Sequence, residues 1–245
     1  MIVIPMAGLS KRFTDAGYTV QKYMLPLNGA TLFDWSVRSF ESYFENEHFT
    51  FVFREIQESK KFITERLKIL GVKNYHLVIL NQETAGQAES VQIGIDQMGL
   101  DDREELHIFN IDTLRPGMVL RRREGSSGGL EVFRADGSNW SFIEPIDAGS
   151  PWVRRCTEKM RISDYCCTGL YYFSTAGLFR QAIQDERLSP SASELYVAPL
   201  FNHLIQRGLK VDWFEVDSNR VLLSGVPPEY TALIGTDFGR HFVRF

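Results

Sequence analysis

Apolar positions in the first half of the chain follow two different periods. Short apolar runs, typical of buried strands, stand at residues 2–5, 49–53, 76–80 and 106–109. Between these runs apolar residues recur at helical spacing, which predicts helices at about residues 32–43, 63–71 and 91–98. Strands that alternate with amphipathic helices indicate βαβ units, so we expect a doubly wound first half with a mostly parallel sheet.

Beyond residue 112 the apolar runs become shorter and closer together. Asp136-Gly137 and Asp147-Ala148-Gly149 separate several of them, and such turns favour tight hairpins. The short strand-like pieces lie at residues 132–133, 140–143, 152–153 and 170–173. Helices are expected again at 176–184, at 200–206 and from about 227, with late strands at 211–216 and 221–223. This half therefore predicts a small antiparallel or mixed sheet next to the doubly wound half.

The expected fold class is α/β, with a Rossmann-like, mixed but mostly parallel sheet sandwiched by helices and a small antiparallel sheet inserted. Neither an internal repeat nor a linker divides the chain, so we expect a single domain over residues 1–245, with halves at 1–115 and 116–245. The low-complexity segment Gly125–Gly129 follows three arginines and is expected to form a mobile surface loop.

Composition narrows the class of protein further. With 44% hydrophobic residues and a net charge of −4, the 245-residue chain is not of the disordered type. The acidic balance offers no bulk attraction for a nucleic-acid backbone or an anionic membrane, so we expect neither partner. The sequence shows neither a signal-peptide pattern nor a membrane-length apolar run, which favours a cytoplasmic protein. The cysteines are odd in number and are expected to be buried apolar residues: Cys156, Cys166 and Cys167.

The turn after the first strand carries the strongest chemical signal. The run Ala7-Gly8-Leu9-Ser10-Lys11-Arg12 leaves a central strand, and Lys22 follows. Small residues in such a turn let backbone N–H groups approach phosphates, to which Arg12 and Lys22 would add positive charge. Neither the P-loop nor the dinucleotide-binding motif is present. A plain glycine turn with two solvated cations remains the alternative at this point.

Asp112 follows the fourth predicted strand in Phe109-Asn110-Ile111-Asp112-Thr113. Ligands of open α/β sheets bind beyond the carboxyl ends of the strands, and a lone carboxylate with substrate phosphates is a usual Mg²⁺ site. Asp112 is thus the metal candidate, although an isolated aspartate also commonly caps a turn. The histidines share no metal-ligand spacing and offer no catalytic triad: His48, His76, His107, His203 and His241.

Together these residues resemble the nucleotidyltransferase family of sugar-1-phosphate pyrophosphorylases and of the cytidylyltransferases of surface-polysaccharide and phosphonate pathways. The resemblance runs in order from residue 1 to about 230. Its matching positions are the turn Ala7 to Arg12, Lys22, Gln82, Gly86, Asp112, Glu158, Lys159, Gly169, Glu194 and Gly225.

The resemblance implies a GT-A-like fold and transfer of a nucleotide from a nucleoside triphosphate to a phosphorylated acceptor with the help of Mg²⁺. The implied catalytic residues are Arg12, Lys22 and Asp112. The implied nucleotide-binding residues are Ala7, Gly8, Leu9, Ser10, Gln82 and Gly86. The implied acceptor-binding residues are Glu158, Lys159, Gly169 and Glu194. Residues 1–115 would then bind the nucleotide and residues 116–245 the acceptor.

Two positions depart from the family pattern. Gln21 stands where relatives carry a proline before the lysine, and this exchange is expected to loosen the loop that presents Lys22. Leu223 stands where relatives usually carry a second metal-binding aspartate. Asp217, a few residues upstream, could substitute only if the strand register allows it, and an ordinary surface aspartate is the alternative.

The expected donor nucleotide and pathway are inferred from more detailed similarities to members of this family. The short chain and the Ala7-Gly8-Leu9-Ser10 turn favour CTP and a role in capsular or other surface-polysaccharide synthesis. Two other functions stay open on the sequence. One is a GT-A glycosyltransferase that uses a nucleotide sugar; the other is a catalytically weakened, nucleotide-binding regulatory subunit.

Overall fold

Four parallel strands form one side of the main sheet in the computed structural model, which describes residues 1–242. β1 (Ile2–Pro5) lies between β4 (His48–Arg54) and β6 (Leu106–Phe109), and β5 (Asn74–Leu80) lies outside β4. Every neighbouring pair among the four is parallel. The doubly wound first half predicted from the apolar pattern is confirmed.

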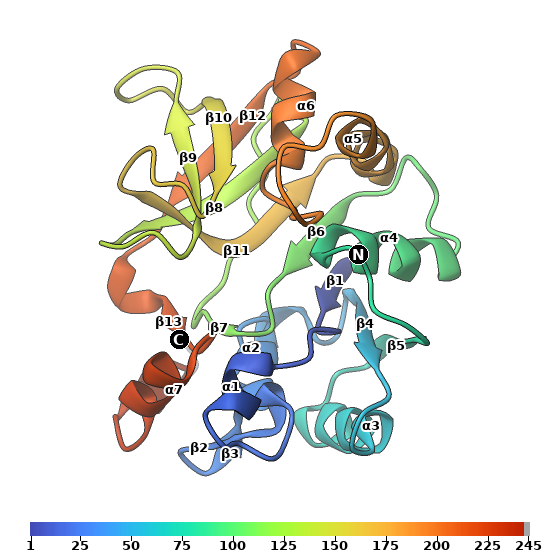
Figure 1. Ribbon diagram of the computed structural model, residues 1–245, viewed down its shortest axis with the longest axis vertical. Helices are drawn as coiled ribbons and strands as arrows, with labels where there is room; N and C mark the ends of the chain where they lie inside the picture. The colour runs from blue at the N-terminus through green and yellow to red at the C-terminus, as the bar shows by residue number, and fades with distance from the viewer. Residues whose placement is uncertain (243–245) are drawn as a thin grey trace.

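The second half extends the same sheet with antiparallel strands. β11 (Tyr165–Phe173) runs antiparallel to β6 and joins the two halves into one nine-stranded sheet. The strands beyond it are β8 (Gly128–Arg134), β9 (Ser141–Pro145), β10 (Val153–Glu158) and β12 (Val211–Glu215). Figure 1 shows them gathered above the parallel strands. The mixed sheet expected from the sequence is therefore present.

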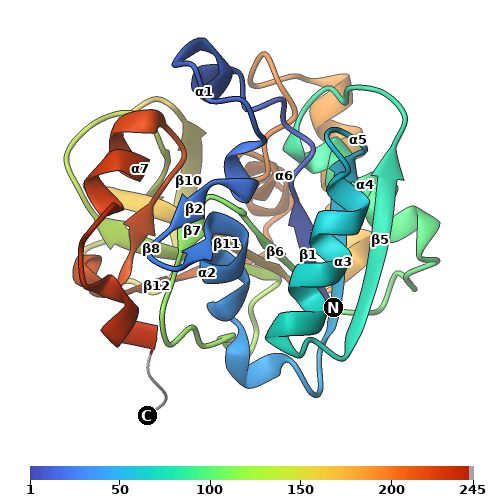
Figure 2. The same cartoon turned by 90° about the horizontal axis from the view of Figure 1, so that it is seen from below.

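Helices cover both faces of the sheet because strand residues alternate between two apolar clusters. Val3 packs in the cluster of α4 (Gln87–Gln97), α5 (Ala176–Leu188) and α6 (Leu200–Gln206). Its neighbours Ile2 and Ile4 pack in the other cluster, with α2 (Leu32–Arg38) and α3 (Ser59–Leu70). Seen from below, α2 and α3 lie over the parallel strands (Figure 2).

Short elements connect this framework. They are α1 (Lys11–Asp15), η1 (Lys22–Met24), β2 (Pro26–Leu27), β3 (Ala30–Thr31), η2 (Glu41–Tyr43), β7 (Thr113–Leu114), η3 (Ser218–Arg220), β13 (Leu222–Leu223), α7 (Pro227–Leu233) and η4 (Phe238–Phe242). The antiparallel pair β7–β13 matters most for the site, because it holds the segment after residue 223 beside Asp112. Ser224 fixes this approach by donating from its backbone N–H and its hydroxyl to the Asp112 carbonyl, each at 2.9 Å.

Two expectations about local structure were wrong. The helix expected at 32–43 ends at Arg38, where i→i+3 bonds tighten the chain and the Ser39 hydroxyl accepts the Arg115 N–H at 2.8 Å. Gly128 and Gly129, expected in a surface loop, are buried at the start of β8. A Cβ on Gly128 would lie 2.7 Å from the Phe201 ring, so this tight packing requires glycine.

The three cysteines are buried free thiols, as expected. None of the helices formed by residues 1–242 combines the length and the apolar character needed to cross a lipid bilayer.

Candidate active site

A pocket of about 310 Å³ lies beyond the carboxyl ends of β1 and β6. A second cavity of about 150 Å³ adjoins it. The two cavities share Arg12, Asn110, Asp112, Ser141, Glu158 and Tyr171. This is the edge where open α/β sheets bind ligands. All three residues implied as catalytic, and three of the four implied as acceptor-binding, line the larger of the two cavities: Arg12, Lys22, Asp112, Glu158, Lys159 and Glu194.

Lys22 and Asp112 form a direct ion pair in this pocket. The Lys22 Nζ lies 2.6 Å from Asp112 Oδ2, and both side chains are only about a quarter exposed, at 22% and 27%. Burial alone would raise the pKa of the Asp112 carboxyl, but the nearby charges of Lys22 and Arg12 hold it below its usual range. Asp112 is therefore an ionised carboxylate with a cation in contact.

The turn after β1 adopts a conformation suited to close approach of a ligand. Gly8 lines the pocket and is exposed, and no atom lies within 4 Å of the place a Cβ would take. Ser10 has a left-handed backbone, with φ of 54°, and begins α1. Its hydroxyl accepts the Lys22 N–H at 3.1 Å. Leu9 is 43% exposed, and Ala7 is partly buried against the core.

Of the residues implied in nucleotide binding only Gly8 lines the pocket, and Gln82 and Gly86 belong to the segment between β5 and α4. Gln82 is exposed in the loop after β5. Gly86 begins α4 with a φ of 154°, and a Cβ there would lie 2.6 Å from the Leu195 nitrogen. Backbone hydrogen bonds fix this contact: the Leu195 N–H donates to Ala85 at 2.9 Å, and the Ala88 N–H donates to Leu195 at 2.8 Å. The segment that carries Glu194 is thus joined to the loop before α4.

The acceptor side of the pocket combines a cation with carboxylates. Lys159 Nζ donates to the Tyr196 hydroxyl at 2.7 Å, and this bond raises the pKa of Lys159. Burial raises the pKa of Glu158, although its carboxylate accepts the Ser141 hydroxyl proton. Glu194 lines the same side and is exposed. This end can accept a phosphate at Lys159 and hydroxyl groups at the two carboxylates.

Gly169 shapes the pocket from behind. Its φ is 94°, and a Cβ would lie 2.7 Å from the Asn110 side chain. Asn110 in turn accepts a hydrogen bond from the Gln87 side chain, and both line the pocket. Asn110 and Gln87 carried no role in the sequence reading. Their positions, two residues before Asp112 and one after Gly86, are the signals that could have found them.

The cavity of about 150 Å³ borders Asp112, Gly225 and Glu229. Gly225 lies next to the Asp112 carboxylate, and a Cβ there would fill the space 3.2 Å from Asp112 Oδ2. The same point lies 3.5 Å from Glu229 Oε2. Burial raises the pKa of Glu229, whose carboxylate accepts the Gly225 N–H at 2.8 Å and the Val226 N–H at 3.2 Å. An ionised carboxylate with open space and a second carboxylate nearby is chemically suited to Mg²⁺.

Asp217 is not brought to this place. It is exposed at the start of η3, where its carboxylate accepts the Asn219 N–H at 3.0 Å, so it behaves as an ordinary capping aspartate. Leu223 lines the second cavity and offers no side-chain oxygen. Within residues 1–242 no three acidic, histidine or cysteine side chains gather as a metal-binding set. The protein thus offers Asp112, with Glu229 behind Gly225.

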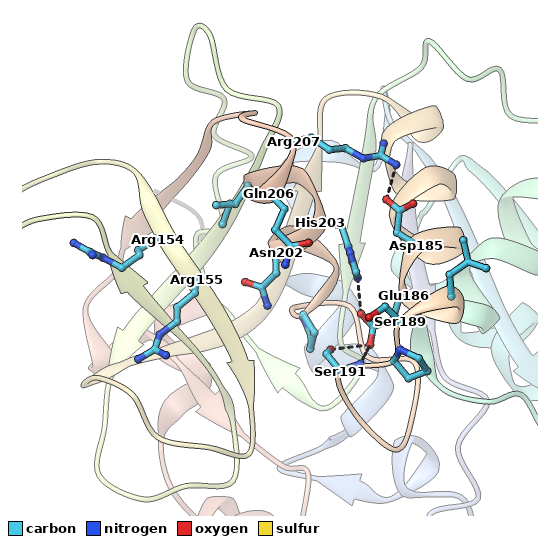
Figure 3. Close-up of a pocket in the computed structure, with 14 residues that line it drawn as sticks. Arg154, Arg155, Asp185, Glu186, Ser189, Ser191, Asn202, His203, Gln206 and Arg207 are labelled. Carbon is cyan, nitrogen blue, oxygen red and sulfur yellow. Dashed lines mark hydrogen bonds and ion pairs between the residues drawn. The ribbon is translucent and has the colours of Figure 1, made fainter.

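A larger cavity of about 640 Å³ lies apart from these residues, between β10 and helices α5 and α6 (Figure 3). Its charged side chains are largely paired: His203 Nε2 lies 2.6 Å from Glu186 Oε2, and Arg207 pairs with Asp185. None of the residues implied in chemistry lines it. The smaller pocket beyond β1 and β6 is therefore the candidate active site.

A solved structure resembles this chain over nearly its whole length. The nucleoside-diphosphate-sugar pyrophosphorylase from Vibrio cholerae RC9 is 43% identical, and the match covers 96% of this chain and 100% of that one with a TM-score of 0.91. No model of a protein family matches the chain, and no curated protein does.

More distant structures share the fold. The inositol-1-phosphate CTP transferase from T. maritima is 15% identical, with a TM-score of 0.71 over 98% of this chain and 92% of that one. A UDP-glucose pyrophosphorylase complexed with UDP-glucose is 15% identical, with a TM-score of 0.72 over 95% of each chain. The relation to the Vibrio protein, nearly end to end, decides the family: this chain belongs to the sugar-phosphate nucleotidyltransferases.

Proposed function

We propose that this protein transfers a nucleoside monophosphate from a nucleoside triphosphate to a small phosphorylated acceptor and releases pyrophosphate. One observation carries the proposal: Arg12, Lys22 and Asp112 converge at one side of a single pocket whose other side presents Glu158 and Lys159. In this proposal residues 1–115 bind the nucleotide and residues 116–245 supply the acceptor contacts, within one domain.

The chemistry needs no covalent bond to the protein. An oxygen of the acceptor's phosphate attacks the α-phosphorus in line, the bond from that phosphorus to the oxygen of the β-phosphate breaks, and this oxygen leaves on pyrophosphate. Catalysis then consists of positioning and charge neutralisation. Arg12 and the N–H groups of the Gly8 turn bind the β- and γ-phosphates. Lys22 neutralises the α-phosphate, and Lys159 holds the acceptor's phosphate.

Asp112 is the proposed ligand of Mg²⁺, because its carboxylate is ionised and borders the cavity that Gly225 and Glu229 also line. Mg²⁺ bound there supplies charge neutralisation at the α-phosphate and helps orient it. Lys22, whose ammonium contacts the same carboxylate, is proposed to contact the phosphate. Glu229 keeps the Gly225 turn in place and adds negative charge behind the metal site.

CTP is the proposed donor, and a sugar phosphate is the proposed acceptor, with other small phosphates or phosphonates as chemically similar candidates. The acceptor class is supported by the 43% identity to a nucleoside-diphosphate-sugar pyrophosphorylase. CTP is supported by the short chain and by the Ala7 to Ser10 turn, which resembles that of the cytidylyltransferases. We place the reaction in the cytoplasm, in the synthesis of a capsular or other surface polysaccharide.

The test is a panel of the common nucleoside triphosphates and phosphorylated acceptors with Mg²⁺, with pyrophosphate release as the readout. We expect release with CTP and a sugar phosphate, and its loss in Asp112→Asn. Silence across the panel, or an Asp112→Asn variant as active as the parent, would overturn the proposal. Turnover of a nucleotide sugar onto a sugar acceptor would indicate a glycosyltransferase, and nucleotide binding without turnover a regulatory subunit.

A further inference from the structure

The segment that presents Lys22 is tied to the turn before α3, to which the sequence assigned no role. The Gln21 N–H donates to Gln57 Oε1 at 3.1 Å, and Gln57 Nε2 donates to the Thr19 carbonyl at 2.6 Å. One glutamine side chain thus clamps the backbone on both sides of Val20. A second link follows directly, because the Tyr23 and Ser59 hydroxyls lie 2.8 Å apart.

The Gln21 side chain continues the connection toward the glycine turn. It is 8% exposed, and its Oε1 accepts the Ser10 hydroxyl at 3.1 Å. The same hydroxyl oxygen accepts the Lys22 N–H at 3.1 Å. The phosphate-binding turn, the lysine segment and the turn before α3 are therefore linked by hydrogen bonds through three side chains, those of Ser10, Gln21 and Gln57.

The backbone at Gln57 is held in an uncommon conformation. Gln57 and Glu58 are consecutive non-glycine residues in the left-handed region, with φ of 55° and 58°. Such a backbone costs free energy and persists where the surroundings fix it. The Gln57 side chain is exposed, so core packing does not explain the conformation. With this backbone conformation the Gln57 side-chain amide contacts Gln21 and Thr19.

Gln21 already has the backbone angle of a proline. Its φ is −58° and its ψ is 139°, within the range to which a proline ring would fix the chain. A proline at this position, however, has no N–H to donate to Gln57 and no amide oxygen for Ser10. The exchange of proline for glutamine thus replaces a ring by two hydrogen bonds, one from the backbone and one to the side chain.

We infer that Gln21 and Gln57 are positioning residues that hold Lys22 in register with the phosphate-binding turn. The inference rests on the proposed function only for the role of Lys22 in the reaction. On this inference Gln21 does not loosen the loop that presents Lys22, as the sequence led us to expect. It secures the loop through contacts that a proline lacks.

Amide hydrogen exchange tests the link without any use of the reaction. In Gln57→Ala we expect the Gln21 and Lys22 amides to exchange roughly fivefold faster, as for the loss of one hydrogen bond. Gln57→Gly also removes the side chain but accepts the left-handed backbone without strain, so it guards against a folding defect at α3. Gln184→Ala, an exposed glutamine on α5, is the control and should change neither amide. Unchanged protection in both Gln57 variants overturns the inference, whatever the protein catalyses.

Kinetics test the consequence for catalysis. We expect Gln57→Ala and Gln57→Gly each to lower kcat for pyrophosphate release about tenfold, with the KM for the acceptor unchanged, because only Lys22 is displaced. In a Gln21→Pro background the further loss caused by Gln57→Ala should shrink several-fold, since no N–H remains for Gln57 to accept. Full activity in Gln57→Gly, or equal effects of Gln57→Ala in both backgrounds, would show that the two glutamines do not act through this bond.

Discussion

Lys22 Nζ donates a 2.6 Å hydrogen bond to Asp112 Oδ2, across 90 residues of sequence. The two side chains come from neighbouring parts of one edge of the sheet, η1 and the end of β6. Each charge neutralises the other, so neither is left uncompensated in a partly buried pocket. In the proposed reaction a phosphate would take the place of Asp112 beside Lys22, and the metal would take the place of Lys22 beside Asp112.

Replacing Lys22 tests its role in the reaction. Lys22→Met should lower kcat/KM for the nucleotide by roughly a hundredfold, or about 3 kcal/mol, because a preorganised positive charge at the α-phosphate is lost. Steady-state pyrophosphate release measures this. Lys68→Met removes an exposed lysine on α3 and should have no effect. A Lys22→Met variant within a factor of two of the parent would exclude a direct role in catalysis.

The same pair predicts a pH dependence of stability. The pKa of Asp112 lies below its ordinary value of 3.8, so its contribution to stability is present above that pH and is lost as the pH falls through the lower folded value. Without Lys22 the cost of burying the ionised Asp112 carboxyl is less compensated, so we expect the fold to be less stable at neutral pH. The gap in free energy of unfolding between the parent and Lys22→Met should therefore be widest near pH 7.

Urea unfolding from pH 7 to pH 3 measures this gap. It should narrow as both proteins approach the protonated state of Asp112. An Asp112→Asn, Lys22→Met double variant carries no carboxyl at this position, so this narrowing should disappear when the double variant is compared with Asp112→Asn. A gap that stays constant with pH would show that the ion pair contributes no stability.

Gly225→Ala tests the space beside Asp112. The new Cβ would lie 3.2 Å from Asp112 Oδ2, so it should crowd the proposed metal position without backbone strain. We expect activity to fall at least several-fold and the Mg²⁺ concentration for half-maximal activity to rise, with little change in Tm. Gly177→Ala is a matched control, because its Cβ would meet Asp102 at the same 3.2 Å, away from the pocket. Equal behaviour of the two variants would contradict a metal site at Gly225.

Variants of Lys159 and Tyr196 test which substrate this side of the pocket binds. Lys159→Met should raise the KM for the acceptor at least about tenfold and leave the KM for the nucleotide unchanged, because a charge-assisted bond to phosphate is lost on one substrate only. Tyr196→Phe removes just the hydroxyl that Lys159 contacts at 2.7 Å and should have a smaller effect. A rise in the nucleotide KM instead would place Lys159 with the donor.

Sequence reasoning found the parallel strands and the residues at their carboxyl ends because both signals are local. A buried run followed by a polar residue predicts a ligand-facing position such as Asp112 wherever the strand lies in the sheet. The shape of α2 was misjudged, since its end depends on the Arg115 N–H from a distant segment. The prediction of a surface loop at Gly128 was wrong for the same reason, because Phe201, against which Gly128 packs, is distant in sequence.

The contributions of Gln57 and Glu229 could not be predicted from the sequence. Gln57 acts through the backbone of Gln21, a contact that sequence spacing does not encode. Glu229 turns back beside Asp112 and accepts the Gly225 N–H, while Asp217, equally far from Leu223 in the sequence, caps a surface turn. Whether a carboxylate lies beside Asp112 thus depends on the conformation of the turn that carries it.

The backbone bonds between Leu195 and the loop before α4 have a consequence for engineering and divergence. Ala85 and Ala88 bind Leu195 from both sides, and Gly86 leaves no space for a side chain between them. A segment carrying Glu194 and Tyr196 transplanted from a relative would meet a loop shaped for another partner. Donor and acceptor preferences should therefore be exchanged as one unit, residues 84–88 together with 189–197, and chimeras that exchange either piece alone should bind both substrates poorly.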